Sequence, residues 1–476
     1  MEEQFSQSNR PVNPRRKKRS KIQILKENFL PVIIAGIAII LIIIFIVGSI
    51  TRAVQKKNFE KKASAKAAHT AQAEQARLKK AAQDLIVKAD DYIAIYDYQG
   101  AIDLLNSFEG DISEFPSIND KILECEAAQR NLVTWADPNQ IPNLSFQLLV
   151  ADSTRGFKHD TYGYSINRNF ITTSEFSRIL QQLYDNGYIL VDFDDFITTE
   201  VNASGDSVYK IKPLLLPKGK KPIMLTQTNV NYNYYLIDSN GDKVPDAGGT
   251  GIASKLLWDG TNFSCEMVDA NGNTVTGDFD LVPILEKFIK KHPDFSYRGA
   301  RATLALTGYN GLFGYRTHPG AKELFGEAAY NKDIAEAKNV ATALKNAGYK
   351  LACYTYENIS YNDASVTQIK GEMNKWNEEV VTILGQFNIF TFAQNNDITT
   401  DPLYSGAKYD TLYENGFRYY IGFSTDGKSW TTITDTYVRQ GRIMVTGSNL
   451  AHKSEWFISM FDAESVLNAD RGNVPS

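Results

Sequence analysis

The sequence predicts an α/β fold in which a parallel sheet closes as a distorted (β/α) barrel over residues 143–476. Short apolar runs that end in polar residues alternate with helical patterns from residue 142 on, and this alternation is typical of parallel sheets. A helix end with Asn-Gly or Asn-Ala-Gly before an aromatic residue occurs at 186–188, 346–349 and 415–417. The segment is also long enough to close into a barrel.

The N-terminal part predicts a membrane anchor. Residues 1–27 are polar and carry the basic cluster Arg15–Arg19, whereas residues 28–51 contain no charge. Such a span is long enough to cross a bilayer as a helix. A dense basic cluster on a short tail favours a cytoplasmic N-terminus. We therefore expect a single-pass protein at the cell membrane, with a basic cytoplasmic tail and an extracellular C-terminal domain.

A helical stalk is expected over residues 52–134. Residues 52–82 are rich in Ala, Lys and Gln and lack Gly and Pro, which favours a helix. In residues 83–134 apolar side chains recur at spacings of three and four, with a break near Tyr98–Gly100. Residues 94–105 resemble the turn of a tetratricopeptide hairpin. A single hairpin of this type usually needs a neighbour, so it could dock on a protein partner or serve as a spacer.

The barrel elements follow in order. Strands are expected at 144–150, 188–191, 222–225, 302–307, 350–352, 388–392 and 418–421. The sequence Thr172-Thr173-Ser174-Glu175 is a capping box that opens a helix, and Gly187 closes that helix. Asp363 is expected to cap a second helix. Residues 236–280 contain Asn-Gly and Asp-Gly turn signals and predict an insertion rich in hairpins.

The residues after the 222–225 strand are the expected functional site, because ligand sites of α/β folds lie at the carboxyl ends of strands. They contain no carboxylate, His or Cys. The three Cys (Cys125, Cys265 and Cys353) and five His of the chain have neither metal-ligand nor disulfide-framework spacing. The net charge of −4 gives no reason to expect nucleic acid as a partner.

Residues from about 143 to 465 resemble the NodB-homology polysaccharide deacetylases, specifically a membrane-anchored bacterial subgroup. The sequences that carry this resemblance are Thr173–Phe176, Leu183–Tyr188, Leu214–Pro222, Phe295–Tyr309 and Tyr437–Arg442. The resemblance implies a distorted (β/α) barrel and the removal of acetyl groups from sugars with the help of a divalent metal.

The motifs that would hold this chemistry are substituted. The family places a base Asp and a ligand Asp where this chain has Thr228 and Asn229, and two ligand His where it has Tyr354 and Asn358. The third motif, usually Pro-Phe-Gly, is Thr391-Phe392-Ala393. A divalent metal needs deprotonated donors. We therefore expect no intact catalytic residue, no metal and no cofactor, and we expect Thr228, Asn229, Tyr354 and Asn358 to converge at one mouth of the barrel.

The resulting hypothesis is a membrane-anchored, catalytically inactive deacetylase-like protein that binds a cell-envelope glycan or a partner protein. One alternative is an active deacetylase or esterase with unconventional ligands. Another is an extracellular scaffold that acts through residues 83–134. The candidate ligand-binding residues are polar and aromatic, since aromatic rings suit the C–H faces of sugars: Asn231, Tyr232, Tyr234, Tyr356 and Arg439, with Tyr235 and Tyr354 in the same predicted cleft.

Four other sequence patterns resemble functional sites. Asp194-Asp195 resembles the first motif but is better explained as a strand edge or helix cap. Cys353 with Glu357 could form a nucleophile and base, yet a buried strand cysteine is the simpler interpretation. Residues 238–246 alternate oxygen ligands as a calcium loop does, but Lys243 replaces the expected Gly, so a polar turn is favoured. His452 stands alone and is interpreted as structural.

Overall fold

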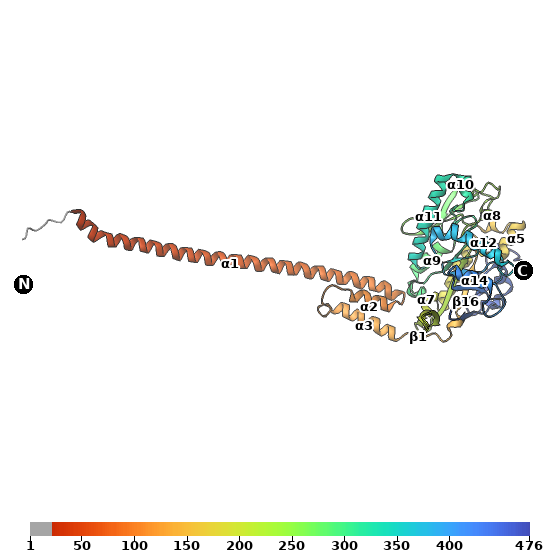
Figure 1. The fold of residues 1–476 in the computed structure, drawn as a ribbon, viewed down its shortest axis with the longest axis horizontal. Helices are drawn as coiled ribbons and strands as arrows, with labels where there is room; N and C mark the ends of the chain where they lie inside the picture. Colours follow the sequence, from red (N-terminus) through yellow and green to blue (C-terminus); the bar gives the residue numbers. More distant parts are fainter. Residues whose placement is uncertain (1–20) are drawn as a thin grey trace, which may run out of the picture. The chain divides into compact units, whose positions relative to one another are not determined.

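The computed structural model describes residues 21–476, with side chains from residue 29 on, so the basic cluster at 15–19 lies outside the described residues. The chain divides into two compact units, residues 1–83 and 84–476. A single helix, α1 (Lys21–Ala94), makes up the described part of the first unit and continues into the second (Figure 1). From Phe29 on, α1 contains an 18-residue window of mean hydropathy 3.4, and none of this window is buried. The helix is therefore long and apolar enough to serve as a single membrane anchor.

Two further helices, α2 (Tyr98–Asn106) and α3 (Pro116–Arg130), follow α1. The break between α1 and α2 falls at residues 95–97, slightly before the expected position at Tyr98–Gly100. The carboxylate of Asp97 accepts a hydrogen bond from the backbone N–H of Gly100 and so caps α2, while Tyr96 adopts a left-handed conformation with φ of 63°. Tyr98 can therefore begin a helix rather than form the turn.

The second unit contains the predicted barrel, which is confirmed. Seven parallel strands pair in the closed order β7-β11-β12-β13-β14-β16-β2, and β2 returns to β7. Their bounds are β2 (Asn143–Phe146), β7 (Lys221–Thr228), β11 (Thr303–Leu306), β12 (Lys350–Cys353), β13 (Ile389–Thr391), β14 (Tyr419–Phe423) and β16 (Val438–Met444).

The barrel is distorted at β7. The first three residues of β7 pair with β3 (Tyr188–Leu190), whereas Thr226–Thr228 pair with β11 on the same side. The strand thus has two successive neighbours on one side and β2 on the other. The pairing between β12 and β13 is also short, because it consists of the single residue pair Cys353 and Phe390.

Helices surround the barrel and short hairpins decorate it (Figure 1). The longer helices are α5 (Thr161–Asn169), α6 (Thr173–Asp185), α9 (Leu281–Lys291), α11 (Glu327–Ala347), α12 (Val366–Trp376) and α14 (Ala407–Glu414). The short ones are α4 (Ser153–Gly156), α7 (Phe193–Phe196), α8 (Tyr234–Ile237), α10 (Gly320–Phe325), α13 (Thr382–Leu384), α15 (Gly447–His452) and α16 (Ala463–Val466). The remaining strands are β1 (Val133–Thr134) with β6 (Leu215–Leu216), β4 (Ile197–Val201) with β5 (Ser207–Ile211), and β15 (Trp430–Ile433) against β16.

The insertion expected at 236–280 forms a separate antiparallel sheet of β8 (Lys255–Trp258), β9 (Phe263–Val268) and β10 (Thr274–Gly277). The capping box at the start of α6 is present, with Thr172 and Glu175 each bonded to the backbone of the other. The second helix cap differs from the expectation. Ser365 rather than Asp363 caps α12, because Ser365 and Gln368 form the reciprocal pair of side-chain and backbone bonds.

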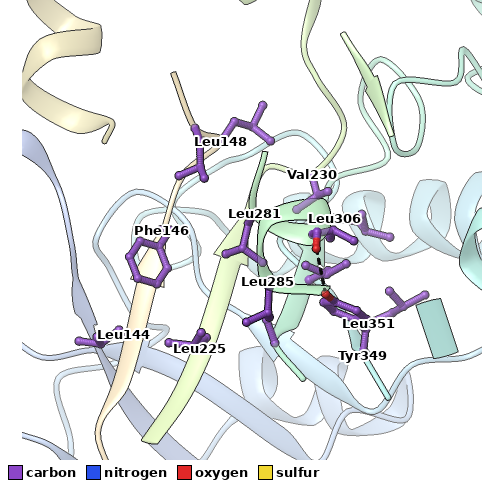
Figure 2. Packing of buried hydrophobic residues seen from close by; sticks show 14 of the residues in the cluster. Leu144, Phe146, Leu148, Leu225, Val230, Leu281, Leu285, Leu306, Tyr349 and Leu351 are labelled. Atoms are coloured by element: carbon purple, nitrogen blue, oxygen red, sulfur yellow. Dashed lines mark hydrogen bonds between the residues drawn. The ribbon is translucent and has the colours of Figure 1, made fainter. Parts of the chain in front are cut away.

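Alternate residues of the strands enter two different hydrophobic clusters. Leu351 and Cys353 of β12 pack with the surrounding helices, while Ala352 and Tyr354 belong to the cluster inside the barrel. Figure 2 shows the outer cluster, in which strand residues such as Leu225 and Leu306 pack with Leu281 and Leu285 of α9. This alternation is the period of two that a strand imposes. It leaves the mouth of the barrel to polar residues at the strand ends.

Candidate functional site: a polar cavity at the carboxyl ends of the strands

A cavity of about 570 Å³ lies at the carboxyl ends of the barrel strands. Residues at or just after the ends of β2, β7, β12, β13, β14 and β16 line it, so that six of the seven strands contribute. The lining comprises seven amide side chains, five Ser or Thr, five aromatic residues, two cations and one Met: Gln147, Asn169, Asn229, Asn358, Gln394, Asn395, Asn449; Ser165, Ser424, Thr425, Thr446, Ser448; Phe170, Tyr235, Tyr354, Phe423, Trp456; Arg168, Lys453; Met444. Among the residues that the structure describes, no Asp, Glu, His or Cys lines this cavity.

The structure brings together three of the four positions expected to converge. Asn229, Tyr354 and Asn358 all line the cavity. Thr228 is the last residue of β7, but its side chain is buried and its hydroxyl donates a hydrogen bond to the carbonyl of Phe146, at 3.3 Å. Thr228 therefore supports the junction of β7 with β2 and does not line the cavity.

The five candidate ligand-binding residues lie elsewhere, and each is engaged inside the protein. Asn231 donates to Asn233 and to Thr307. Tyr232 is fully buried and donates to Asp280 at 2.6 Å. The structure thus brings neither side chain into the cavity.

The other three candidates are also packed internally. The ring of Tyr234 stacks under the guanidinium of Arg316, and the hydroxyl of Tyr356 donates to Glu379. Arg439 forms an ion pair with Asp397, at 2.8 Å, and donates to nearby carbonyls. Of the tyrosines predicted to form an aromatic cleft, only Tyr235 and Tyr354 line the cavity.

The backbone at the cavity is unusual, because four lining residues adopt the left-handed conformation. Asn229, Asn358, Gln394 and Asn395 have φ values of 60°, 57°, 57° and 56°. Non-glycine residues in this region are strained, and such strain concentrates at functional sites. Asn is the residue that tolerates this conformation best after Gly. An Asn soon after a predicted strand is therefore the sequence signal that could have pointed to Asn395, as the family resemblance pointed to Asn358.

Buried hydrogen bonds hold the loop that carries Tyr354 and Asn358. One carboxylate oxygen of Glu372 accepts the backbone N–H groups of Tyr356 and Glu357, at 2.8 and 2.9 Å. Burial raises the pKa of this Glu372 carboxyl. The amide of Gln394 donates to the carbonyl of Asn358, at 3.0 Å, and so joins the loops after β12 and β13. The cavity wall is therefore preorganised by the protein itself.

Two amide oxygens of the cavity lack partners. Asn229 is 7% exposed and donates to the side chain of Gln147, at 3.0 Å, but its Oδ1 atom accepts no hydrogen bond. The Oδ1 atom of Asn358 is likewise buried and unpartnered. A buried acceptor without a partner costs free energy. Both oxygens are therefore suited to a ligand that donates hydrogen bonds.

The divalent metal that the family resemblance implies does not fit these residues. Zinc is held by thiolate, imidazole or carboxylate donors, usually three at a catalytic site, whereas the polar lining of the cavity consists of neutral amides, hydroxyls, two phenols and two cations. Within residues 21–476 no group of three or more His, Cys, Asp or Glu side chains is placed to hold a metal ion.

The motif Asp194-Asp195 and the pair Cys353 and Glu357 have structural roles. Asp195 and Asp192 form the capping box of α7, and Asp194 forms an ion pair with Lys350, at the opposite end of β12 from the cavity. Burial raises the pKa of the Cys353 thiol well above its usual range, and Glu357 is paired with Lys375.

Two further patterns have local roles as well. The carboxylate of Asp238 accepts the backbone N–H groups of Asn240, Gly241 and Lys243, as in a polar turn. The Nε2 atom of His452 lies 3.0 Å from the carbonyl of Val474, within hydrogen-bonding distance.

A second cavity, of about 790 Å³, borders the first. Thr425, Lys453 and Trp456 line both cavities, and Trp135 and Tyr188 line the second. The indole of Trp456 is only partly buried. The two cavities thus share a wall that contains the Trp456 indole. Local sequence patterns do not predict this shared wall, because the residues that line the two cavities are far apart in the chain.

No protein-family model matches the chain, and no curated protein matches it. Among solved structures, the chain is similar to the Streptococcus pyogenes deacetylase PplD in complex with acetate, with 14% sequence identity and a TM-score of 0.32. The alignment covers 68% of this chain and 100% of that one. At this level the likeness carries nothing about activity, and the barrel stands on the strand pairing described above.

Proposed function

We propose that this protein is a membrane-anchored, polysaccharide-deacetylase-like receptor that has lost catalysis and binds an oligosaccharide of the cell envelope. One observation carries the proposal: the cavity at the strand ends is lined by amides, hydroxyls and aromatic rings, with no carboxylate or imidazole among the described residues. Amides and hydroxyls match the hydrogen-bonding groups of sugars, and ring faces match their C–H surfaces.

The chemistry of hydrolysis lacks its parts in this cavity. A general base must lie within hydrogen-bonding reach of the water it activates, and the cavity lining contains no carboxylate or imidazole to act as one. Tyr354 occupies one of the two positions at which the family resemblance implies a His ligand. Binding without turnover is therefore the function that these residues support.

The neighbouring cavity favours an oligosaccharide over a single sugar. Trp456 and Lys453 form part of both cavities, so a linear chain that fills the first can continue past the indole into the second. Each additional stacked sugar adds contact between its C–H face and an aromatic ring. Affinity should consequently rise with chain length.

The proposal is tested by titrating the full chain in detergent with linear tetrasaccharides, both neutral and acidic, and measuring heat and released acetate. We expect binding without acetate release above background. Trp456→Ala should weaken binding about tenfold. The matched control is Trp258→Ala, since Trp258 of β8 is also partly buried but lines neither cavity.

Two results would count against the proposal. Equal binding by the Trp456→Ala and wild-type proteins, with both folded, would remove the cavity from the binding site. Acetate release that depends on the cavity would instead favour the alternative of an active deacetylase with unconventional ligands.

The proposed topology places the barrel outside the cell, on the argument from the basic cluster at 15–19 and the uncharged span that follows it. Protease added to intact cells should digest residues C-terminal to the span and leave a short N-terminal fragment. The control is the same digestion after lysis. Protection of the barrel in intact cells would reverse the orientation.

A further inference from the structure

The cavity carries positive charge that the protein does not neutralise. Arg168 and Lys453 line it, and neither forms an ion pair with any described side chain. No acidic residue of the described chain lines the cavity, although the whole protein has a net charge of −4. The excess of positive charge is therefore confined to the cavity and is not a property of the whole protein surface.

A third cation lies inside the barrel next to the cavity. Arg442 of β16 is 0% exposed. Its guanidinium donates to the carbonyls of Ile421, at 2.9 Å, Gly422, at 3.2 Å, and Phe392, at 2.6 Å, but to no carboxylate. Its Nε atom has no partner at all. Arg442 is thus a buried cation held by backbone carbonyls and aromatic rings, without a direct carboxylate partner.

This buried charge is close to the cavity wall. The guanidinium carbon of Arg442 lies 3.9 Å from the ring centre of Phe423 and 5.8 Å from that of Tyr354, and both rings line the cavity. Burial lowers the pKa of Arg442 to about 10, so the group remains charged at neutral pH. A charge in a low-dielectric site acts strongly on a nearby ion, and an anion in the cavity would offset the cost of burying this one.

We propose that the cavity selects a saccharide that carries an anionic group, a carboxylate or a phosphate, over a neutral saccharide. This inference rests on the proposed saccharide-binding function and adds the class of ligand to it. The anion would lie against Arg168 and Lys453, and the buried charge of Arg442 would attract it from behind the rings of Phe423 and Tyr354. The unpartnered oxygens of Asn229 and Asn358 would accept hydrogen bonds from the sugar hydroxyls, which a simple anion does not offer.

The test compares three linear glucose tetramers that differ only at C6: neutral, oxidised to the carboxylate, and phosphorylated. Binding to the full chain in detergent is measured by calorimetry at low salt and at about 0.5 M salt, where exposed charges are largely screened. We expect the acidic tetramers to bind at least about tenfold more tightly at low salt, with the difference shrinking at high salt. The tighter of the two acidic ligands identifies the anion.

Substitution tests whether the cavity cations cause the preference. The double variant Arg168→Gln/Lys453→Gln should lower the affinity for the acidic tetramers by a much larger factor than the affinity for the neutral one, because Lys453 also contacts the Trp456 ring that a neutral sugar would use. Both side chains are exposed, so folding should be unaffected. The matched control is Lys290→Gln, because Lys290 of α9 is exposed, lines neither cavity and forms no ion pair with the described side chains.

Each remaining outcome decides against the inference in a distinct way. Equal affinity for all three tetramers would overturn the anionic preference and leave the saccharide-binding proposal standing. Binding of none of them would overturn both. Binding of inorganic phosphate as tight as that of the phosphorylated tetramer would show an anion site that does not recognise the sugar.

Discussion

The backbone of Gly427 lies directly against the indole ring of Trp456. A Cβ atom built on Gly427 would overlap the indole, and Gly427 has a φ of +75°. The ammonium of Lys453 lies 4.2 Å from the centre of the same ring. Because Trp456 is common to both cavities, Gly427 fixes the position of the wall that they share.

Gly427→Ala should therefore move Trp456 and weaken saccharide binding, and it should lower the free energy of unfolding by about 1–3 kcal/mol. Calorimetry and urea unfolding measure the two effects. The control is Gly205→Ala, which has a similar φ of +88° but open space around the added Cβ. If both variants lose the same affinity, the contact with Trp456 is not what positions the wall.

A buried ion pair joins the C-terminal segment to α6. Arg471 and Glu175 are almost fully buried and bonded through both carboxylate oxygens. Arg471→Met should lower the free energy of unfolding by about 3–5 kcal/mol, since Glu175 would remain buried without its partner. Lys322→Met breaks the exposed pair with Glu327 and should change stability by less than about 0.5–1 kcal/mol. Denaturant unfolding of the two variants should therefore differ clearly.

Stability should depend on pH through Asp195 at the amino end of the barrel strands. Burial, and then the negative charge of Asp192, raise the pKa of Asp195 to about 7. In the unfolded chain an Asp loses its proton near pH 4. Between these values the folded state binds more protons than the unfolded state, so stability falls as the pH rises from about 4 to about 7.

Asp195→Asn should flatten this part of the stability curve, because the amide stays neutral and its oxygen can still accept the backbone N–H of Asp192, a bond of 2.9 Å in the wild type. Above pH 7 the variant should be the more stable protein, by up to about 4 kcal/mol, since the two pKa values of Asp195 differ by about three units at about 1.4 kcal/mol each. Urea unfolding at several pH values measures both curves. If the unfolding free energies of the wild type and the variant change in parallel between about pH 4 and about pH 7, Asp195 is ionised in the folded protein over that range.

The sequence was sufficient for the barrel because its signals are local. Apolar runs and the Asn-Gly helix ends at 186–188 and 415–417 mark where elements stop, and the observed β3 and β14 begin within a few residues of them. The cavity was only partly predictable. The ends of β7 and β12 were expected to meet, and Asn229 and Tyr354 do line one cavity.

The other features of the site depend on contacts between residues that are distant in the chain. Tyr232 has the polar neighbours of a cleft residue, yet its hydroxyl is bonded to Asp280, 48 residues later. Arg439 is held by Asp397, 42 residues before it. No local pattern shows whether a side chain after a strand turns toward the mouth or toward such a partner, and the same limit hid Trp456 and Gln394.

The positions of Asn229, Tyr354 and Asn358 allow the metal site implied by the family resemblance to be rebuilt. The triple variant Asn229→Asp/Tyr354→His/Asn358→His places one carboxylate and two imidazoles on a shared cavity, which is the donor set of many catalytic zinc sites. We expect it to bind about one zinc ion per chain and to gain thermal stability as zinc is added, because ligand binding to the folded state stabilises it. Metal analysis after dialysis and melting curves measure these effects.

The double variant with only the two His should bind zinc more weakly, since it lacks the charged oxygen donor. Acetate release should remain at background even in the triple variant, because the family base position is Thr228, whose hydroxyl is bonded to the carbonyl of Phe146 away from the cavity. A folded triple variant that binds no zinc would show that the three side chains do not approach to metal-ligand distance, and it would refute the proposed correspondence with the family's motifs.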